Sequence, residues 1–338
     1  MKKSLVYLAV GMLIFTICLG SSLITNQAKA AEEYKISVVL KALNSDYWKS
    51  VKAGAEAAAE KYGVNLSVIG PNNETQVIQQ INLLEDQLVK GVQGLVVAPL
   101  RPQAAKTVLE KAVSRDIAVI TIDTDADFEG KTSFAGTGNF QAAEKAGKYF
   151  ADILAGQGKV AIIRGAAGDY IHDQRVDGFM QGIEGTAVEV VSVQPADSSR
   201  GKAVNVMQNI IQSYPDVNAV YATNDEMALG AERALKSANQ AGVKVMGFDG
   251  SPDALKSIRN GELTATVKQD SYGIGYTGVE LMVKHLAGET VASEVPVPTF
   301  IIDQNNVDAS IRDLTKAFSR DRLEVLFGED VIAEVFAE

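Results

Sequence analysis

The sequence of 338 residues is poor in cysteine and histidine, the side chains that most often act as nucleophiles, general bases or metal ligands. It contains one cysteine, Cys18, and two histidines, His172 and His285. A single cysteine cannot form an intramolecular disulfide, so the fold must be stabilised by its hydrophobic core. Neither histidine has the spacing of a zinc site or of a Ser-His-Asp triad, and no nucleophile elbow or phosphate loop is present. We therefore expect no catalytic centre, no metal site and no cofactor.

Basic residues are also in deficit. The chain has 32 Lys and Arg against 42 Asp and Glu, which gives a formal net charge of −10. An acidic surface repels the phosphate backbone of nucleic acids. We therefore expect no nucleic-acid partner.

The sequence contains no apolar run long enough for a typical membrane-spanning helix. Lys2 and Lys3 precede the apolar segment Leu5–Leu19, and the small-residue sequence Ala28-Lys29-Ala30 follows it. The apolar segment is shorter than the ~20 residues that a transmembrane helix needs, and the order of features is that of a secretory signal peptide. We predict a signal peptide over residues 1–30. The mature chain would lie in the periplasm or at the outer face of the cytoplasmic membrane.

Two alternatives for the N-terminus are a membrane anchor and a lipid anchor on Cys18. Lipidation requires a small residue just before the cysteine, and Ile17 stands there. The signal peptide is the favoured interpretation.

Beyond the leader, short apolar runs alternate with segments that have helical spacing, such as Trp48–Tyr62 and Val77–Val89. Near-continuous apolar strands alternating with helices are typical of parallel sheets that are covered on both faces. The number of units favours two doubly wound domains over one closed barrel of eight units. The runs are Ile36–Leu40, Leu66–Ile69, Gly94–Ala98, Ala118–Ile122, Val160–Ile163, Val188–Val193, Ala219–Ala222, Val243–Phe248 and Leu263–Val267.

Two short motifs resemble known sites without their context. Gly273–Gly278 matches the GxGxxG pattern, but a dinucleotide site needs it at the first strand-to-helix turn. Asp123–Asp127 resembles the start of a calcium loop, but Phe128 and Phe134 occupy the positions where such a loop needs Gly and Glu. We expect neither site.

Polar residues recur where the predicted strands end. They are Lys41, Asp123, Asn224, Asp249 and Gln269. In open α/β sheets, ligands bind outside the carboxyl ends of the strands. Carboxylates accept hydrogen bonds, Lys donates them, and amides do both, which suits a ligand rich in hydroxyl groups. The alternative is that single Asp and Asn residues only cap helices and turns.

Several longer stretches resemble the periplasmic ribose/allose-type sugar-binding proteins. The most specific are Val38–Trp48, Gln194–Asn209, Asn224–Ala231 and Gly247–Ala254. The resemblance implies the type I periplasmic binding protein fold, with two Rossmann-like parallel-sheet lobes joined by a hinge of three strands. The strands would cross near Thr137, Gln269 and Pro298. The N-terminal lobe would comprise residues 34–137 and 270–298, and the C-terminal lobe residues 138–269 and 299–310.

The resemblance also implies a binding site between the lobes. Asp173 falls where ribose binders have Arg and the allose binder has Glu. Ser198 stands where both relatives carry a large aromatic residue, and Thr124 replaces an Arg of the ribose binders. These departures put ribose in doubt. The residues implied to bind the ligand are Lys41, Tyr47, Trp48, Asp123, Asp173, Asn224, Phe248, Asp249 and Gln269.

The function that the resemblance implies is capture of a neutral monosaccharide, a ribose- or allose-like pentose or hexose, for an ABC importer. A cyclitol such as inositol or a hexose derivative is the alternative ligand. The implied partners are an ABC permease and, in some relatives, a chemotaxis receptor, and we expect a monomer. A LacI-type repressor would carry a helix-turn-helix where the leader stands, and an exported sugar-modifying enzyme is the other alternative.

The last segment, residues 311–338, has many charges and no strand–helix alternation. Its apolar residues form at most a weak amphipathic pattern. We interpret it as a frayed or vector-derived extension. The apolar residues are Leu314, Phe318, Leu326, Val331 and Val335.

Overall fold

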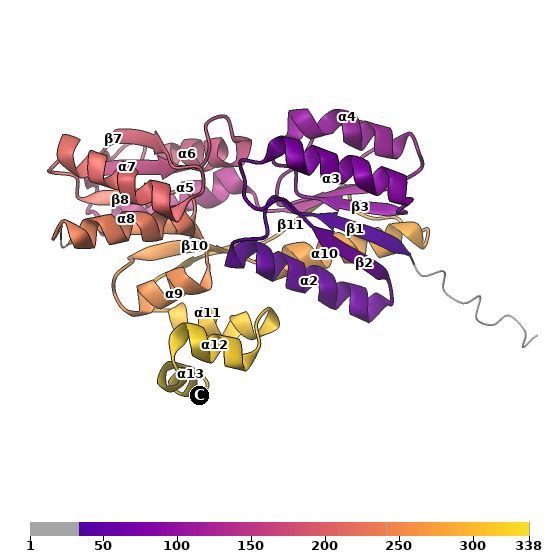
Figure 1. Ribbon diagram of the computed structural model, residues 1–338. Coiled ribbons are helices and arrows are strands. Elements are labelled where there is room, and N and C mark those ends of the chain that lie inside the picture. Colours follow the sequence, from indigo (N-terminus) through magenta and orange to yellow (C-terminus); the bar gives the residue numbers. More distant parts are fainter. Residues whose placement is uncertain (1–33, 241, 338) are drawn as a thin grey trace, which may run out of the picture. The chain divides into compact units, whose positions relative to one another are not determined.

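Two six-stranded sheets organise the computed structural model, which describes residues 34–240 and 242–337 (Figure 1). The predicted signal peptide, residues 1–30, lies outside the described residues. Within them, no helix has both the length and the apolar character that crossing a membrane requires.

The first sheet is parallel throughout, in the order β11-β5-β4-β3-β1-β2. Helices α2 (Asp46–Tyr62) and α10 (Ser271–Leu286) cover one face, and α3 (Val77–Lys90) and α4 (Pro102–Val113) cover the other (Figure 1). Its strands are β1 (Lys35–Val39), β2 (Asn65–Ile69), β3 (Gly94–Val97), β4 (Ala118–Ile122), β5 (Ser133–Gly136) and β11 (Glu294–Pro296).

The second sheet has the order β12-β10-β9-β8-β6-β7, and only the edge strand β12 runs antiparallel. Helices α5 (Asn139–Ile153) and α6 (Tyr170–Gly182) pack on one face, and α7 (Arg200–Ser213), α8 (Asp225–Ser237) and α9 (Pro252–Arg259) on the other. Its strands are β6 (Gln157–Arg164), β7 (Ala187–Pro195), β8 (Ala219–Ala222), β9 (Lys244–Asp249), β10 (Ala265–Gln269) and β12 (Thr299–Ile302).

Both sheets are buried on both faces, as the continuous apolar strands predict. In β1, Val38 packs in the cluster under α2 and α10, whereas its neighbour Val39 packs in the cluster under α3 and α4. In β6, Ile162 and Ile163 divide in the same way between the two clusters of the second sheet. The predicted fold class, two doubly wound parallel-sheet lobes, is confirmed, and the single-barrel alternative is wrong.

The chain passes between the two sheets three times. It does so between β5 and α5, between β10 and α10, and between β11 and β12. We refer to the part built on the first sheet as the N-terminal lobe and the part built on the second as the C-terminal lobe. Polar loops at the strand ends of both lobes line a common cavity, described below.

The GxGxxG sequence lies at the start of α10 and has a packing role. A Cβ atom on Gly275 would come within 1.9 Å of the carbonyl oxygen of Val51 on α2, and one on Gly54 within 1.9 Å of the carbonyl oxygen of Tyr272. Only glycine permits such a close approach of two helix backbones. The glycines therefore fix α10 against α2.

The C-terminal segment differs from its prediction. It forms α11 (Val307–Asp313), a 3₁₀ turn (Leu314–Lys316), α12 (Arg320–Phe327) and α13 (Glu329–Val335). Ile311, Leu323 and Ile332 are fully buried in one cluster with Leu255 and Ile258 of α9. The interpretation as a frayed extension is wrong, because the weak amphipathic pattern is sufficient to bury these apolar residues against the C-terminal lobe.

Polar contacts reinforce this packing. Arg259 of α9 pairs with Asp308 at 2.9 Å and with Glu334 at 2.6 Å. Lys256 donates to the carbonyl oxygen of Leu326 at 2.5 Å.

Ile332→Ala should therefore lower the free energy of unfolding by about 2–5 kcal/mol, as for other large-to-small changes in a core. Chemical denaturation measures this loss. Val325→Ala is the matched control, because Val325 lies in the same segment with 74% of its surface exposed, and its effect should stay within about 0.5 kcal/mol. Equal effects of the two substitutions would contradict the packing described here.

Candidate functional site

Polar side chains from the strand ends of both lobes meet in a small inner chamber of 20 Å³. Six of the nine residues that the resemblance implied line it. They are Lys41, Tyr47, Trp48, Asp123, Asn224 and Asp249, and Glu74, Ile171, His172 and Arg175 complete the wall.

Asp123, which directly follows β4, is the centre of the N-terminal wall. Its carboxylate is buried and accepts hydrogen bonds from Lys41 Nζ at 2.8 Å, Tyr47 Oη at 2.6 Å and Thr124 Oγ1 at 2.9 Å. Burial acts to raise the pKa of Asp123, but the charge of Lys41 and the hydrogen bonds outweigh it and hold the pKa below its usual value. Asp123 is therefore an ionised acceptor at neutral pH.

Trp48 and Glu74 form the side of the same wall. Trp48 Nε1 donates to Glu74 Oε1 at 2.8 Å, and the ring of Tyr47 meets that of Trp48 edge-on at 4.9 Å. Burial raises the pKa of Glu74, although the charge of Lys41 and the Trp48 hydrogen bond oppose the shift. Sequence reasoning missed Glu74, which lies in a loop without strand or helix periodicity.

Arg175 of α6 is the centre of the C-terminal wall. It is buried, and it donates to Asn139 Oδ1 at 2.8 Å, to the carbonyl oxygen of Thr223 at 2.8 Å and to Asp249 Oδ1 at 3.2 Å. Its guanidinium carbon lies 3.8 Å from the centroid of the Phe248 ring. These contacts fix the plane of the guanidinium group, which is the geometry that bidentate hydrogen bonding needs.

Asp249, the last residue of β9, connects Arg175 to β10. Gln269 Nε2 donates to Asp249 Oδ1 at 2.7 Å. Burial raises the pKa of Asp249 well above its usual value, and the charge of Arg175 opposes this shift. The backbone of Asp249 has φ of 121°, and that of Asp123 has φ of 61°. Non-glycine residues with positive φ are uncommon and concentrate at functional sites.

Three implied residues do not line the inner chamber: Phe248 contacts Arg175, Gln269 contacts Asp249, and Asp173 lies elsewhere. Its carboxylate pairs with Arg164, and it lines neither the inner chamber nor the larger cavity beside it. Residues two positions apart on a helix point in different directions, and of Asp173 and Arg175 only Arg175 lines the inner chamber. The spacing of His172, Arg175 and Phe179 on the buried face of α6 is the sequence signal that would have indicated Arg175.

His172 is buried behind the chamber wall. Its Nδ1 lies 2.7 Å from Thr223 Oγ1, and its Nε2 lies 3.1 Å from Ser198 Oγ. Burial lowers the pKa of His172 to about 3, and the charges of Arg175 and Lys41 act in the same direction. The imidazole is therefore neutral at physiological pH. Among the described residues, no three His, Cys, Asp or Glu side chains come together in a group that would hold a metal ion.

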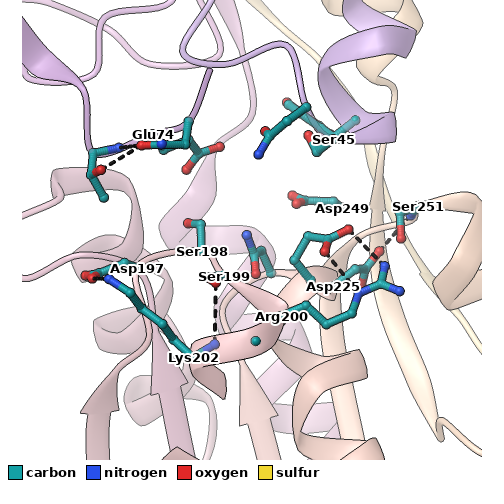
Figure 2. Close-up of a pocket in the computed structure, with 17 residues that line it drawn as sticks. Ser45, Glu74, Asp197, Ser198, Ser199, Arg200, Lys202, Asp225, Asp249 and Ser251 are labelled. Atoms are coloured by element: carbon teal, nitrogen blue, oxygen red, sulfur yellow. Dashed lines mark hydrogen bonds and ion pairs between the residues drawn. The ribbon is translucent and has the colours of Figure 1, made fainter. Parts of the chain in front are cut away.

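A larger cavity of 470 Å³ adjoins the inner chamber. Figure 2 shows Ser45 and Glu74 of the N-terminal lobe facing Ser198, Ser199 and Arg200 of the C-terminal lobe across it. We call this cavity the outer chamber.

A salt bridge joins the two lobes beside the cleft. Arg101, which precedes α4, donates to Asp169 Oδ2 at 3.1 Å and to the carbonyl oxygen of Ala167 at 3.3 Å. Asp169 also caps α6 through the backbone N–H of Ile171 at 3.0 Å. The lobes are therefore in direct contact in this structure.

Known proteins share this architecture. The family described as periplasmic binding protein domain matches residues 36–290. The ribose import binding protein of Salmonella typhimurium is 39% identical over 273 residues, which is 81% of this chain and 92% of that protein.

Two solved structures are also similar. An ABC transporter periplasmic solute binding protein from Actinobacillus succinogenes with bound D-allose has a TM-score of 0.78 and 27% identity, over 82% of this chain and 99% of that chain. A solute binding protein from Bacillus halodurans with bound myo-inositol has a TM-score of 0.77 and 27% identity, over 83% and 98%. The resemblance found in the sequence is confirmed, and the chain belongs to the periplasmic binding protein family.

Proposed function

We propose that this chain captures a neutral sugar or polyol between its lobes and delivers it to an ABC importer. The observation that carries the proposal is the convergence of Asp123 from one sheet and Asp249 from the other on one chamber. Each carboxylate is held by a buried cation and by a neutral donor. A ring with several hydroxyl groups can exchange hydrogen bonds with such acceptors and donors on both sides.

The charge of the site supports a neutral ligand. Lys41 pairs with Asp123, and Arg175 pairs with Asp249, which leaves Glu74 as an additional carboxylate. The additional negative charge would repel an anionic ligand such as a sugar phosphate. It would not repel a neutral polyhydroxyl compound.

The similar proteins support the ligand class. Their names and bound molecules include ribose, D-allose and myo-inositol. We propose a ribose- or allose-like monosaccharide as the ligand class, with a cyclitol or hexose derivative as the alternative. The resemblance implies an aromatic residue where Ser198 stands, and this departure favours a ligand other than ribose.

The proposed location and partners follow from the same role. A protein that serves an importer must be exported, so we propose the periplasm or the outer face of the cytoplasmic membrane, with residues 1–30 as the signal peptide. The proposed partner is a membrane permease of the ABC type. Docking on a chemotaxis receptor and a monomeric state are further expectations from the resemblance.

We propose binding without turnover. In a sugar-modifying enzyme, two carboxylates would act as acid and base on a glycoside. Here Asp123 and Asp249 are engaged by cations and hydrogen-bond donors that hold them as ligands for hydroxyl groups. Incubation with glycosides should therefore release no product.

Asp249→Ala should weaken binding by about 3 kcal/mol, or about a hundredfold in Kd, because it leaves Arg175 and the ligand hydroxyls without their acceptor in a desolvated site. Isothermal titration calorimetry measures this with a ligand selected by a thermal-shift screen of pentoses, hexoses and cyclitols. Asp216→Asn, which removes an exposed ion pair with Lys159, is the control and should leave Kd unchanged. Unchanged affinity of Asp249→Ala would contradict the proposed site.

A second pair of variants distinguishes Arg175 from Asp173. Arg175→Gln should weaken binding by about tenfold or more, because charge-assisted hydrogen bonds are lost. Asp173→Ala should change Kd by less than about threefold, as expected for a side chain outside the site. The reverse order of effects would show that Asp173 contacts the ligand and that the helix face assigned here is incorrect.

A further inference from the structure

The backbone at Asp249 is strained and needs support from its surroundings. Asp249 has φ of 121°, and the next residue, Gly250, has φ of 75°. A residue other than glycine keeps such a conformation only where the surrounding structure enforces it. Hydrogen bonds from Arg175 and Gln269 hold the Asp249 side chain. The backbone that follows Asp249 requires a contact of its own.

Lys268, which lines neither chamber, makes that contact. It lies directly opposite Asp249 in the sheet, because β10 pairs with β9 in this register. Its stem fills the space beside Gly250: a Cβ atom added to Gly250 would lie 2.6 Å from Cγ and 2.8 Å from Cβ of Lys268. The methylene groups of Lys268 therefore limit the movement of the turn that follows Asp249.

Lys268 and its neighbour Gln269 support this region together. Successive side chains of a strand point to opposite faces of the sheet. Gln269 donates to the carboxylate of Asp249 at 2.7 Å, whereas the stem of Lys268 lies against Gly250. Strand β10 thus holds both the side chain of Asp249 and the backbone beyond it.

The C-terminal segment anchors the ammonium group of Lys268. Lys268 Nζ donates to Asp313 Oδ2 at 2.9 Å, and only 15% of the Lys268 side chain is exposed. Burial acts to raise the pKa of Asp313, but the hydrogen bond and the charge of Lys268 outweigh it and hold the pKa below its usual value. The ion pair is therefore formed at neutral pH.

This anchor restricts a stem that is not packed on every side. Lys268 and Asp313 both line a cavity of 170 Å³, together with Tyr272 and Leu314. A lysine stem beside such a space has several staggered rotamers open to it. The ion pair with Asp313 selects the rotamer that lies against Gly250.

Asp313 is itself fixed by the core of the C-terminal lobe. It is the last residue of α11, and its neighbours Ile311 and Leu314 are buried in the cluster that contains Leu255 of α9. Helix α9 begins shortly after Asp249. The C-terminal segment is therefore packed on the helix that follows Asp249 and paired with the strand beside it.

We propose that Lys268 is a positioning residue for Asp249 and that Asp313 of the C-terminal segment holds Lys268 in place. Lys268 does not contact the ligand, and it acts through Gly250 on the backbone of Asp249. The C-terminal segment lies beyond the matched residues 36–290, and in this account it contributes to solute binding. This inference rests on the proposed function and goes beyond it.

Calorimetry on the chain without its predicted signal peptide tests the role of Lys268. The probe is the tightest-binding member of a panel of D-ribose, D-allose, D-glucose, D-galactose and myo-inositol. Lys268→Ala should weaken binding by about fivefold or more, because the turn after Asp249 loses its support. Lys268→Arg, which keeps the first methylene groups and the charge, should bind within about twofold of the unchanged chain.

A matched control is available in the same sheet. Lys159 lies in β6 and forms an ion pair with Asp216 at 2.5 Å, but it lines neither chamber and has no contact with the turn after Asp249. Lys159→Ala should leave Kd unchanged.

A double substitution shows whether Lys268 acts through Asp249. In the Asp249→Ala background, Lys268→Ala should have little further effect on Kd, because the residue that it positions is already absent. An equal loss in both backgrounds would show that Lys268 acts elsewhere and would overturn the inference.

The part assigned to the C-terminal segment has its own variant. Asp313→Ala should weaken binding in the same direction as Lys268→Ala, by about threefold. Asp321→Ala, which changes an exposed aspartate of the same segment, is its control and should leave Kd unchanged. A loss in Lys268→Ala without any loss in Asp313→Ala would contradict the role of the segment.

The outcomes separate this inference from the proposed function. Wild-type affinity of Lys268→Ala, with binding still weakened in Asp249→Ala, would overturn the inference and leave the proposed function intact. Binding of no probe by the unchanged chain would overturn both.

Discussion

Charged side chains in the cleft are removed from water, and each of the central ones is therefore held by a partner of opposite charge. A buried charge without a partner costs several kcal/mol, so Lys41 requires Asp123, and Arg175 requires Asp249. These two pairs come from different lobes and face one chamber. The same pairing that stabilises each lobe also fixes hydrogen-bond donors and acceptors at the wall of the chamber.

The same structural feature positions the aspartate of each pair in both lobes. In each lobe a parallel strand, β4 or β9, delivers an aspartate at its carboxyl end, and the backbone of that aspartate has positive φ. The chain crosses between the sheets three times. The inner chamber is lined by side chains from both lobes, so neither lobe alone supplies all of its binding groups. The Arg101–Asp169 salt bridge joins the two lobes. Binding and contact between the lobes are consequently linked.

Sequence alone predicted the fold class, because its strands are near-continuous apolar runs. The predicted run Ile36–Leu40 overlaps the observed β1, and Val160–Ile163 lies within β6. The short strands β5, β11 and β12 have only three or four residues and left no periodic signal. Lys41, Asp123 and Asp249 were indicated by their place at strand ends. Glu74 could not be indicated in this way, since a loop has no periodicity. Asp173 came from the family resemblance, and Arg175 was not identified because the buried face of α6 was not considered. The C-terminal helices were missed because their apolar residues are few, although most of these residues are buried in the core of the C-terminal lobe.

The central claim is that one ligand is held by both lobes at once. A crystal structure of the complex with the tightest ligand found by screening tests it most directly. The account predicts one molecule in the cleft, with its hydroxyl groups within hydrogen-bond distance of Asp123 on one side and of Asp249 and Arg175 on the other. A ligand that contacts a single lobe, or that lies outside the cleft, would contradict the account.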